Sequence, residues 1–155
     1  ITVDNILEVF DKMMLEMDED GTPPTGRILY ITPTENAKLK RAKEIARTVI
    51  IGDAENKLNR TIANLDLVKI VPVPSKYMKT VYDFTQGFKA GASAKQIRMC
   101  LIHPLAVITP VNYEFAKLDE PSAMSEGKWV YYEESHEDVF VLARKVKAIQ
   151  FAVEK

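Results

Sequence analysis

The chain has 155 residues, of which 46% are hydrophobic. That length suffices for one domain that buries most of its apolar surface and is too short for two ordinary ones, so we expect a single domain over residues 1–155. Lysine and arginine number 21 against 22 for aspartate and glutamate. This near-zero net charge gives no reason to propose nucleic acid or an anionic membrane as the partner, and it permits self-association.

The single cysteine, Cys100, excludes an internal disulfide framework and agrees with a reducing compartment. No apolar run approaches the roughly 20 residues needed to cross a bilayer, and no secretory signal opens the chain, so we expect a soluble protein. The chain begins with Ile1 rather than Met and enters an amphipathic pattern almost at once. This beginning suggests a fragment or a processed product of a longer protein.

Apolar residues at helical spacing predict a core-facing helix over residues 4–17. Three of its apolar residues are methionines, which suit either core filling or an adaptable partner groove, and core filling is the simpler interpretation. The stretch "DEDGTPPTG" that follows combines acids, two glycines and a proline pair. It predicts a surface loop.

The stretch "RILYITPTENAKLK" predicts a buried strand over residues 27–31 that runs directly into a helix. Thr32 suits the N-cap and Pro33 the first helical position, and Glu35 stands three residues after the cap. Together these three residues predict a capping box in which Thr32 and Glu35 bond to free N–H groups at the helix start. We expect this helix to continue to about residue 48, with Leu39, Ala42 and Ile45 facing inward.

The remaining chain reads mainly as strands and loops. Strands are predicted over 67–74, 98–103, 105–109, 128–135, 138–143 and 146–153, and loops over 52–66, 83–95 and 114–127. With two main helices and five to seven strands, the pattern predicts an α+β fold with a central mixed, largely antiparallel sheet flanked by the helices.

No catalytic motif emerges from the sequence. His103 and His136 lack a second ligand at metal-binding spacing; the acids around His136 in "EESHED" favour an acidic turn between two strands over a cation site. Cys100 lies in an apolar run, where a thiol is normally inert. Thr32 and Thr34 have no identifiable base to activate a hydroxyl. We therefore expect no enzyme activity, no cofactor and no metal.

The order of four segments carries a resemblance to a known family. They are "GRILYITPTENAKLK", "LNRTIANLDLVKIVPVP", "FKAGASAKQIRMCLIHPLAVI" and "WVYYEESHEDVFVLARKVKAIQFAV". In this order, the segments resemble the C-terminal half of tailed-phage major capsid proteins of the Hong Kong 97 type. The resemblance covers nearly the whole chain and rests on the succession and spacing of short apolar segments with prolines.

This resemblance implies a structural subunit of an icosahedral phage or prophage shell, found in the virion and, during assembly, in the bacterial cytoplasm. Residues 1–142 would correspond to the axial domain, while residues 143–155 would form a strand that belongs to either the axial or the peripheral domain. The family's N-terminal arm, extended loop and spine helix would precede Ile1. The partners would be other copies of the chain, although this fragment alone could be monomeric.

The resemblance also places the polar loop 52–60 at the symmetry axes of the shell. Its charged residues, Asp53, Glu55, Lys57 and Arg60, would form ion pairs between rotated copies.

Two alternatives remain open. The first is a small enzyme or ligand-binding domain with its site at the Ile31–Glu35 corner, which a deep pocket lined by Thr32, Thr34 and His103 would favour. The second is an encapsulin-like compartment shell, which shares the fold and differs in its contents.

Overall fold

A computed structural model describes residues 1–46, 62–85 and 87–154. Its helices are α1 (Ile6–Glu19), α2 (Pro33–Leu39) and α3 (Lys43–Ala46). Its short 3₁₀ helices are η1 (Ser75–Tyr77), η2 (Pro104–Ala106) and η3 (Ala143–Ala148). Its strands are β1 (Ile28–Ile31), β2 (Asn64–Leu65), β3 (Val68–Pro72), β4 (Tyr82–Asp83), β5 (Lys89–Ala90), β6 (Ile97–Ile102), β7 (Val107–Ile108), β8 (Val111–Asp119), β9 (Val130–Glu137), β10 (Phe140–Val141) and β11 (Ile149–Val153). The fold is α+β, as predicted.

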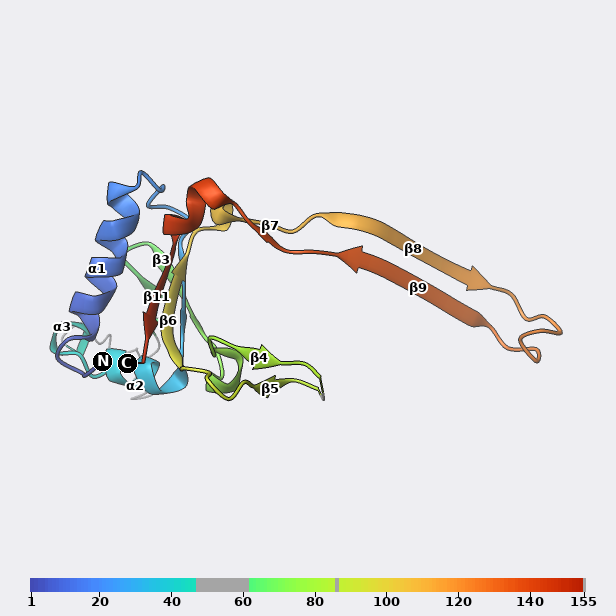
Figure 1. Cartoon of the computed structure of the whole chain (residues 1–155), viewed down its shortest axis with the longest axis horizontal. Coiled ribbons are helices and arrows are strands. Elements are labelled where there is room, and N and C mark those ends of the chain that lie inside the picture. The colour runs from blue at the N-terminus through green and yellow to red at the C-terminus, as the bar shows by residue number, and fades with distance from the viewer. Residues whose placement is uncertain (47–61, 86, 155) are drawn as a thin grey trace, which may run out of the picture.

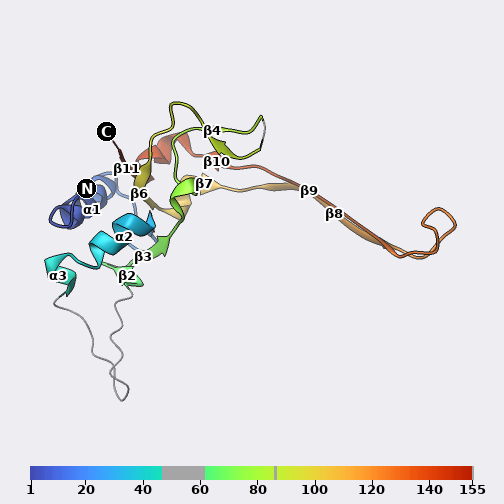
Figure 2. The same ribbon diagram turned by 90° about the horizontal axis from the view of Figure 1, so that it is seen from below.

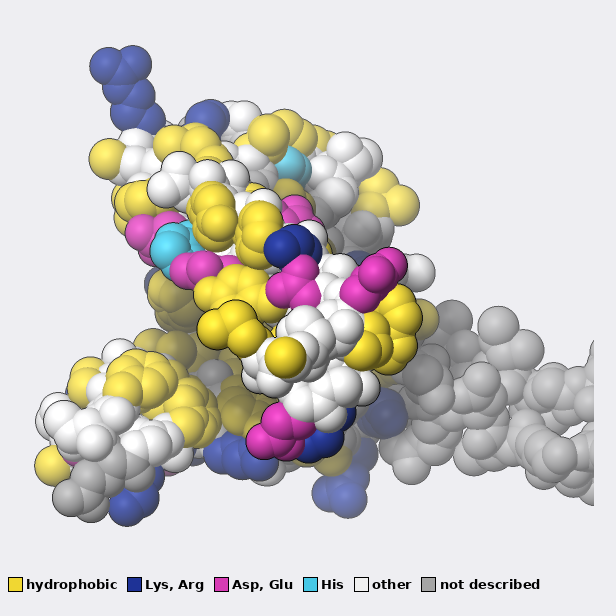
Figure 3. Space-filling view, turned by 90° about the vertical axis from the view of Figure 1, so that its right-hand side faces the viewer, with side chains coloured by type: hydrophobic (Ala, Val, Ile, Leu, Met, Phe, Trp, Pro, Cys, Tyr) yellow, Lys and Arg dark blue, Asp and Glu magenta, His cyan; other side chains and the backbone are white. Residues whose placement is uncertain are grey.

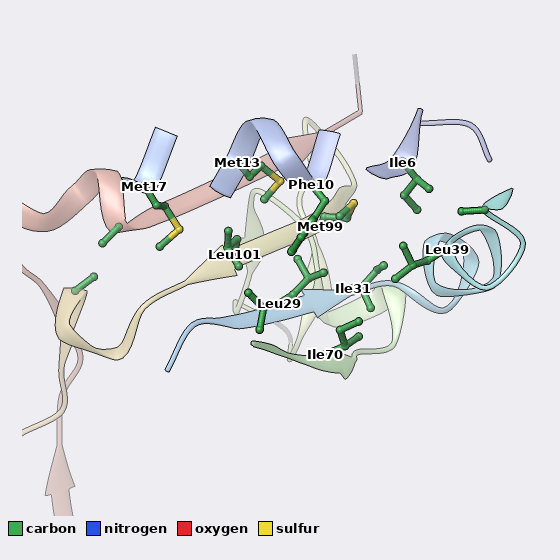
Figure 4. Packing of buried hydrophobic residues seen from close by; sticks show 14 residues of the cluster. Ile6, Phe10, Met13, Met17, Leu29, Ile31, Leu39, Ile70, Met99 and Leu101 are labelled. Carbon is green, nitrogen blue, oxygen red and sulfur yellow. The ribbon is translucent and has the colours of Figure 1, made fainter. Parts of the chain in front are cut away.

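Helix α1 forms where the apolar spacing predicts it. Ile6, Phe10, Met13 and Met17 recur at three- and four-residue intervals and are all buried. That spacing places them on one face of the helix, and this face packs against the sheet (Figure 4). Two methionines of the helix therefore fill the core, as the simpler interpretation predicted.

Five strands form the sheet in the order β11-β6-β1-β3-β2. Strand β1 pairs with β3 in parallel, whereas the other three pairings are antiparallel, which confirms a mixed, largely antiparallel sheet. Residues in β1 and β6 alternate in burial, so that Leu29, Ile31, Met99 and Leu101 are fully buried on one face (Figure 4). We name α1, α2 and this sheet the body.

Arg27, just before β1, is only 1% exposed. Its guanidinium donates to the backbone oxygens of Thr22 at 2.6 Å and Pro23 at 2.9 Å and forms an ion pair with Asp18. A buried cation requires such partners because burial removes its hydration. Arg27 thus ties the loop after α1 to the end of that helix.

The second predicted helix is wrong in its extent. Instead of one helix over residues 33–48, α2 ends at Leu39 and the short α3 begins at Lys43. Between them, Arg41 and Ala42 donate to carbonyls three residues earlier, at Lys38 and Leu39, so the turn is tighter than an α-helix.

The loops predicted over 52–66, 83–95 and 114–127 are also wrong in part. The first contains strand β2 near its end, and this strand pairs with β3. Residues 82–90 contain the β4–β5 hairpin, and residues 111–119 form β8, which pairs with β9 along almost its whole length. The acidic segment around His136 lies within β9 rather than in a turn. More strands are therefore present in the described residues than the five to seven expected.

Strands β8 and β9 form a two-stranded ribbon that projects far from the body (Figures 1 and 2). We name residues 111–137 the arm. No helix in the described ranges is long and apolar enough to span a membrane. Strand β11, in the predicted segment 143–155, lies at the edge of the body sheet beside β6. The division of the chain at residue 142 stays a prediction.

Candidate functional site

The strand–helix corner is the first place where sequence reasoning put a site. Thr32 takes an extended N-cap conformation and Pro33 the first helical position, as predicted. The backbone N–H of Thr32 donates to the Arg98 oxygen at 3.1 Å, and its backbone oxygen accepts from Asn36 at 2.9 Å. Its side chain makes no capping bond, so the predicted capping box is wrong.

Glu35 has a different role from the one predicted. Its side chain is fully buried, and Oε1 accepts from Arg98 at 2.6 Å and from Lys38 at 3.0 Å. A buried carboxylate requires cationic partners more than a neutral N–H group, which explains why Glu35 turns away from the helix start. The hydrogen bond to Glu35 is also the main reason that the pKa of Arg98 lies above its usual value. Arg98 extends the network to Glu154 at 2.6 Å.

His103 does not join this corner. Ile31 is paired with Met99, and Ile28 with Ile102, so His103 follows the opposite end of β6. There its Nδ1 accepts from the Leu105 backbone at 3.1 Å, and Nε2 lies 3.0 Å from the Thr25 oxygen. Both ring nitrogens are used by backbone groups. The pocket of Thr32, Thr34 and His103 that would favour an enzyme is therefore not assembled.

The other reactive side chains are equally separate. Burial raises the pKa of Cys100 to about 11, so the thiol is protonated and weakly nucleophilic at neutral pH. His136 lies on the exposed ribbon with Nε2 3.0 Å from Glu134. Within the described ranges, no three His, Cys, Asp or Glu side chains are grouped to hold a metal ion.

The predicted contact residues Asp53, Glu55, Lys57 and Arg60 lie outside the described residues. Their role in contacts between copies stays a prediction.

Sequence reasoning predicts the second strand of the arm, over residues 128–135, but misses most of the first strand, β8, and the ribbon that the two strands form. Every residue of β8 is exposed, and all of β9 except Glu134 is too. A two-stranded ribbon in water is marginally stable at best because neither face is covered. The arm therefore displays hydrophobic surface that a partner can cover.

Register defines the two faces of the arm. Tyr113 lies opposite His136, Phe115 opposite Glu134, and Lys117 opposite Tyr132. Opposed side chains share a face, so this face carries Tyr113, Phe115 and Tyr132; ring centroids of Phe115 and Tyr132 are 6.0 Å apart. We name it the aromatic face of the arm. Figure 3 shows hydrophobic side chains at the surface around the arm, which points toward the viewer.

One feature of the sequence could have predicted strand β8. In "VNYEFAKL" the apolar residues Val111, Tyr113 and Phe115 alternate with polar ones, which is typical of a strand rather than of the loop predicted from Glu114 onward. The second strand has no such alternation, because Trp129, Val130, Tyr131 and Tyr132 form a continuous apolar run. The alternation in β8 is short because neither face of the strand is buried in this chain, so no core requires apolar residues on one side.

Comparisons with known proteins support the fold alone. No protein-family model matches the chain, and no curated protein sequence is significantly similar to it. A solved structure from Mycobacterium phage Che8 is similar over 96% of this chain, with a TM-score of 0.53 and 12% sequence identity. The match covers 48% of the phage chain, so this chain spans about half its length. The fold described here is thus one that a phage protein adopts.

Proposed function

We propose that the chain is a structural subunit, or part of one, that assembles with copies of itself into an icosahedral phage or prophage capsid. On this proposal the chain works through surfaces rather than through a reactive centre. It would act in the virion shell, after assembly in the bacterial cytoplasm.

The observation that carries the proposal is the shared fold with the Che8 structure over 96% of the chain. Such coverage includes the body and the arm together, not merely a common sheet motif. The match agrees with the segment order that resembles phage major capsid proteins of the Hong Kong 97 type.

The arm gives independent support. Its aromatic face exposes Tyr113 and Phe115, which are 44% and 38% accessible, whereas Phe10 of α1 and Leu29 of the sheet are fully buried. Exposed apolar surface of this kind is typical of a protein–protein interface. Closed shells supply a partner for such a surface on every copy.

The enzyme alternative has weaker support. Thr32 and Glu35 are buried, and Glu35 is engaged by Arg98 and Lys38. The two cations at the corner, Arg98 and Lys38, are therefore paired with Glu35 of the same chain, so the corner is not an open site for an anionic ligand.

Electron microscopy of the full-length protein that contains these residues, expressed alone, tests the proposal. We expect closed particles of uniform diameter with the body visible in each subunit. Monomers or irregular aggregates at concentrations where capsid proteins assemble would contradict it. Particles isolated from the native source that enclose protein cargo instead of DNA would favour the compartment-shell alternative.

A further inference from the structure

The β4–β5 hairpin carries an unusual group of exposed aromatic rings. Tyr82 and Phe88 stack with centroids 4.6 Å apart, Tyr77 lies 5.5 Å from Phe88, and Phe84 lies 6.0 Å from it. Even in this cluster, Phe84 is 70% exposed, Tyr77 53% and Phe88 49%. We name these four residues the aromatic knob. It forms a projecting hydrophobic lobe at the lower left of Figure 3.

Lysines outnumber acids in the segments that carry the knob. Lys76, Lys79, Lys89 and Lys95 lie on the hairpin and its flanks, against one acid, Asp83. Within the described ranges, none of the four lysines forms an ion pair, although the ammonium of Lys76 lies 4.7 Å from the centroid of the Tyr77 ring. The knob is therefore an apolar cluster with Lys76 against one of its rings, in segments that carry an excess of positive charge, and apolar residues flanked by charged ones are the usual anatomy of a protein contact.

A matching surface lies along α1. A shallow hollow there has the apolar side chains of Met14 and Leu15 and the acids Glu8, Asp11, Asp18 and Asp66 in its lining. Leu15 is 57% exposed, on the helix surface that faces away from the core. Lys12 is the single cation in the lining. We name this surface the acidic hollow.

The turn beside the hollow adds a second sign of function. Asp66 and Leu67 join β2 to β3 with φ values of 47° and 66°. This left-handed conformation favours glycine or asparagine, so a leucine there is strained. Leu67 is nevertheless 75% exposed. A strained, exposed leucine next to the hollow is readily explained by a contact with another molecule.

The knob and the hollow lie on opposite sides of the body. In Figure 1, α1 covers one face of the sheet, whereas the β4–β5 hairpin extends away on the other side. One chain therefore presents the two surfaces in opposite directions. Such a head-to-tail arrangement closes into rings when successive copies are related by rotation.

We propose that the aromatic knob of one copy docks into the acidic hollow of the next copy. The rings of Phe84 and Phe88 meet Leu15 and Met14, and the lysines of the segments that carry the knob approach Glu8 and Asp11. This inference rests on the proposed shell function for its ring geometry. Charge favours this pairing. The segments that carry the knob have four lysines against one aspartate, whereas the hollow has Glu8, Asp11 and Asp66 against Lys12, with Asp18 already paired to Arg27.

Cysteine cross-linking in the full-length protein tests the contact. Leu15→Cys and Phe84→Cys are made separately in a Cys100→Ser background, mixed and mildly oxidised. Because a disulfide forms only when the two Cα atoms come within about 7 Å, we expect the mixture to give mainly the Leu15→Cys/Phe84→Cys heterodimer. The control, Arg144→Cys mixed with Phe84→Cys, has an equally exposed thiol on η3 and should give little product.

A charge exchange supplies the second arm of the test. Glu8→Lys with Asp11→Lys should lower the yield of the cross-link about tenfold or more, because like charges then face one another. Adding Lys76→Glu and Lys89→Glu to the partner chain should restore it. An unchanged yield in the reversed variant, or no recovery in the exchanged pair, would overturn the proposed docking.

The outcomes separate this inference from the proposed function. Closed shells without the heterodimer would overturn the knob–hollow contact and leave the shell proposal standing, whereas cross-linked rings or chains that never close would support the contact and contradict the shell. Loss of the cross-link on addition of a single-stranded DNA oligonucleotide would assign the knob to nucleic acid and overturn the docking.

Discussion

The body and the arm use hydrophobic residues in opposite ways. Phe10 in α1 is fully buried against the sheet, while Phe115 in the arm keeps 38% of its surface accessible. The body can therefore fold on the strength of its own contacts, because its apolar side chains leave water when α1 meets the sheet. The arm gains little of this stabilisation within one chain. On the proposed shell function, its conformation depends on the neighbouring copy that covers it.

This difference separates stability from assembly. Substitutions in the body should change the free energy of unfolding of the chain by itself. Substitutions on the aromatic face of the arm should change association and leave that free energy almost unaltered. The following predictions test this separation, from the largest effect to the smallest.

Truncating one phenylalanine in each region gives the sharpest contrast. Phe10→Ala leaves a cavity under α1 and should lower the free energy of unfolding by about 3–5 kcal/mol. Phe115→Ala should change it by less than about 0.5 kcal/mol in the isolated chain, as for an exposed site. Urea denaturation followed by circular dichroism measures both. Equal losses at the two positions would contradict the separation.

The buried network at the corner should give the next largest effect. Glu35→Gln keeps the size of the side chain but removes the charge that Arg98 and Lys38 share, so we expect a loss of about 1.5–3 kcal/mol. Glu154→Gln is the matched control, because it removes an exposed partner of the same Arg98 and should cost less than about 1 kcal/mol. Thermal or urea unfolding of the two variants gives the comparison, and a larger loss for Glu154→Gln would reverse our ranking.

The smallest effect in the body is expected at Thr32. Thr32→Val retains the branched shape and removes only the hydroxyl, which makes no capping bond. The free energy of unfolding should therefore change by no more than about 0.5 kcal/mol. A side-chain cap would instead contribute about 1 kcal/mol, so a loss of that size would restore the capping box that the sequence suggested.

Sequence reasoning succeeded for segments whose apolar side chains pack into the core of this same chain. The spacing of Ile6, Phe10 and Met13 predicts α1, and the β-branched and aromatic content of residues 27–31 predicts β1, because both segments face the same core. The position of Thr32 and Pro33 at the start of α2 was found for a similar local reason.

Elsewhere the deciding contacts are distant in the sequence. Leu39, Ala42 and Ile45 keep helical spacing across the break between α2 and α3, so the pattern does not mark where the helix ends. Glu35 has capping-box spacing, yet its partner Arg98 lies 63 residues away. Most of β8 was missed because both of its faces are exposed, so no core of this chain marks one face of the strand as apolar.

Hydrogen–deuterium exchange of the full-length protein before and after assembly tests the central claim most directly. In the unassembled subunit, amides in β1 and β6 should be strongly protected, while those of β8 and β9 should exchange nearly as fast as in an unstructured peptide. In assembled particles, both regions should be protected. An arm as protected as the sheet in the free subunit, or an arm that remains unprotected after assembly, would contradict the account.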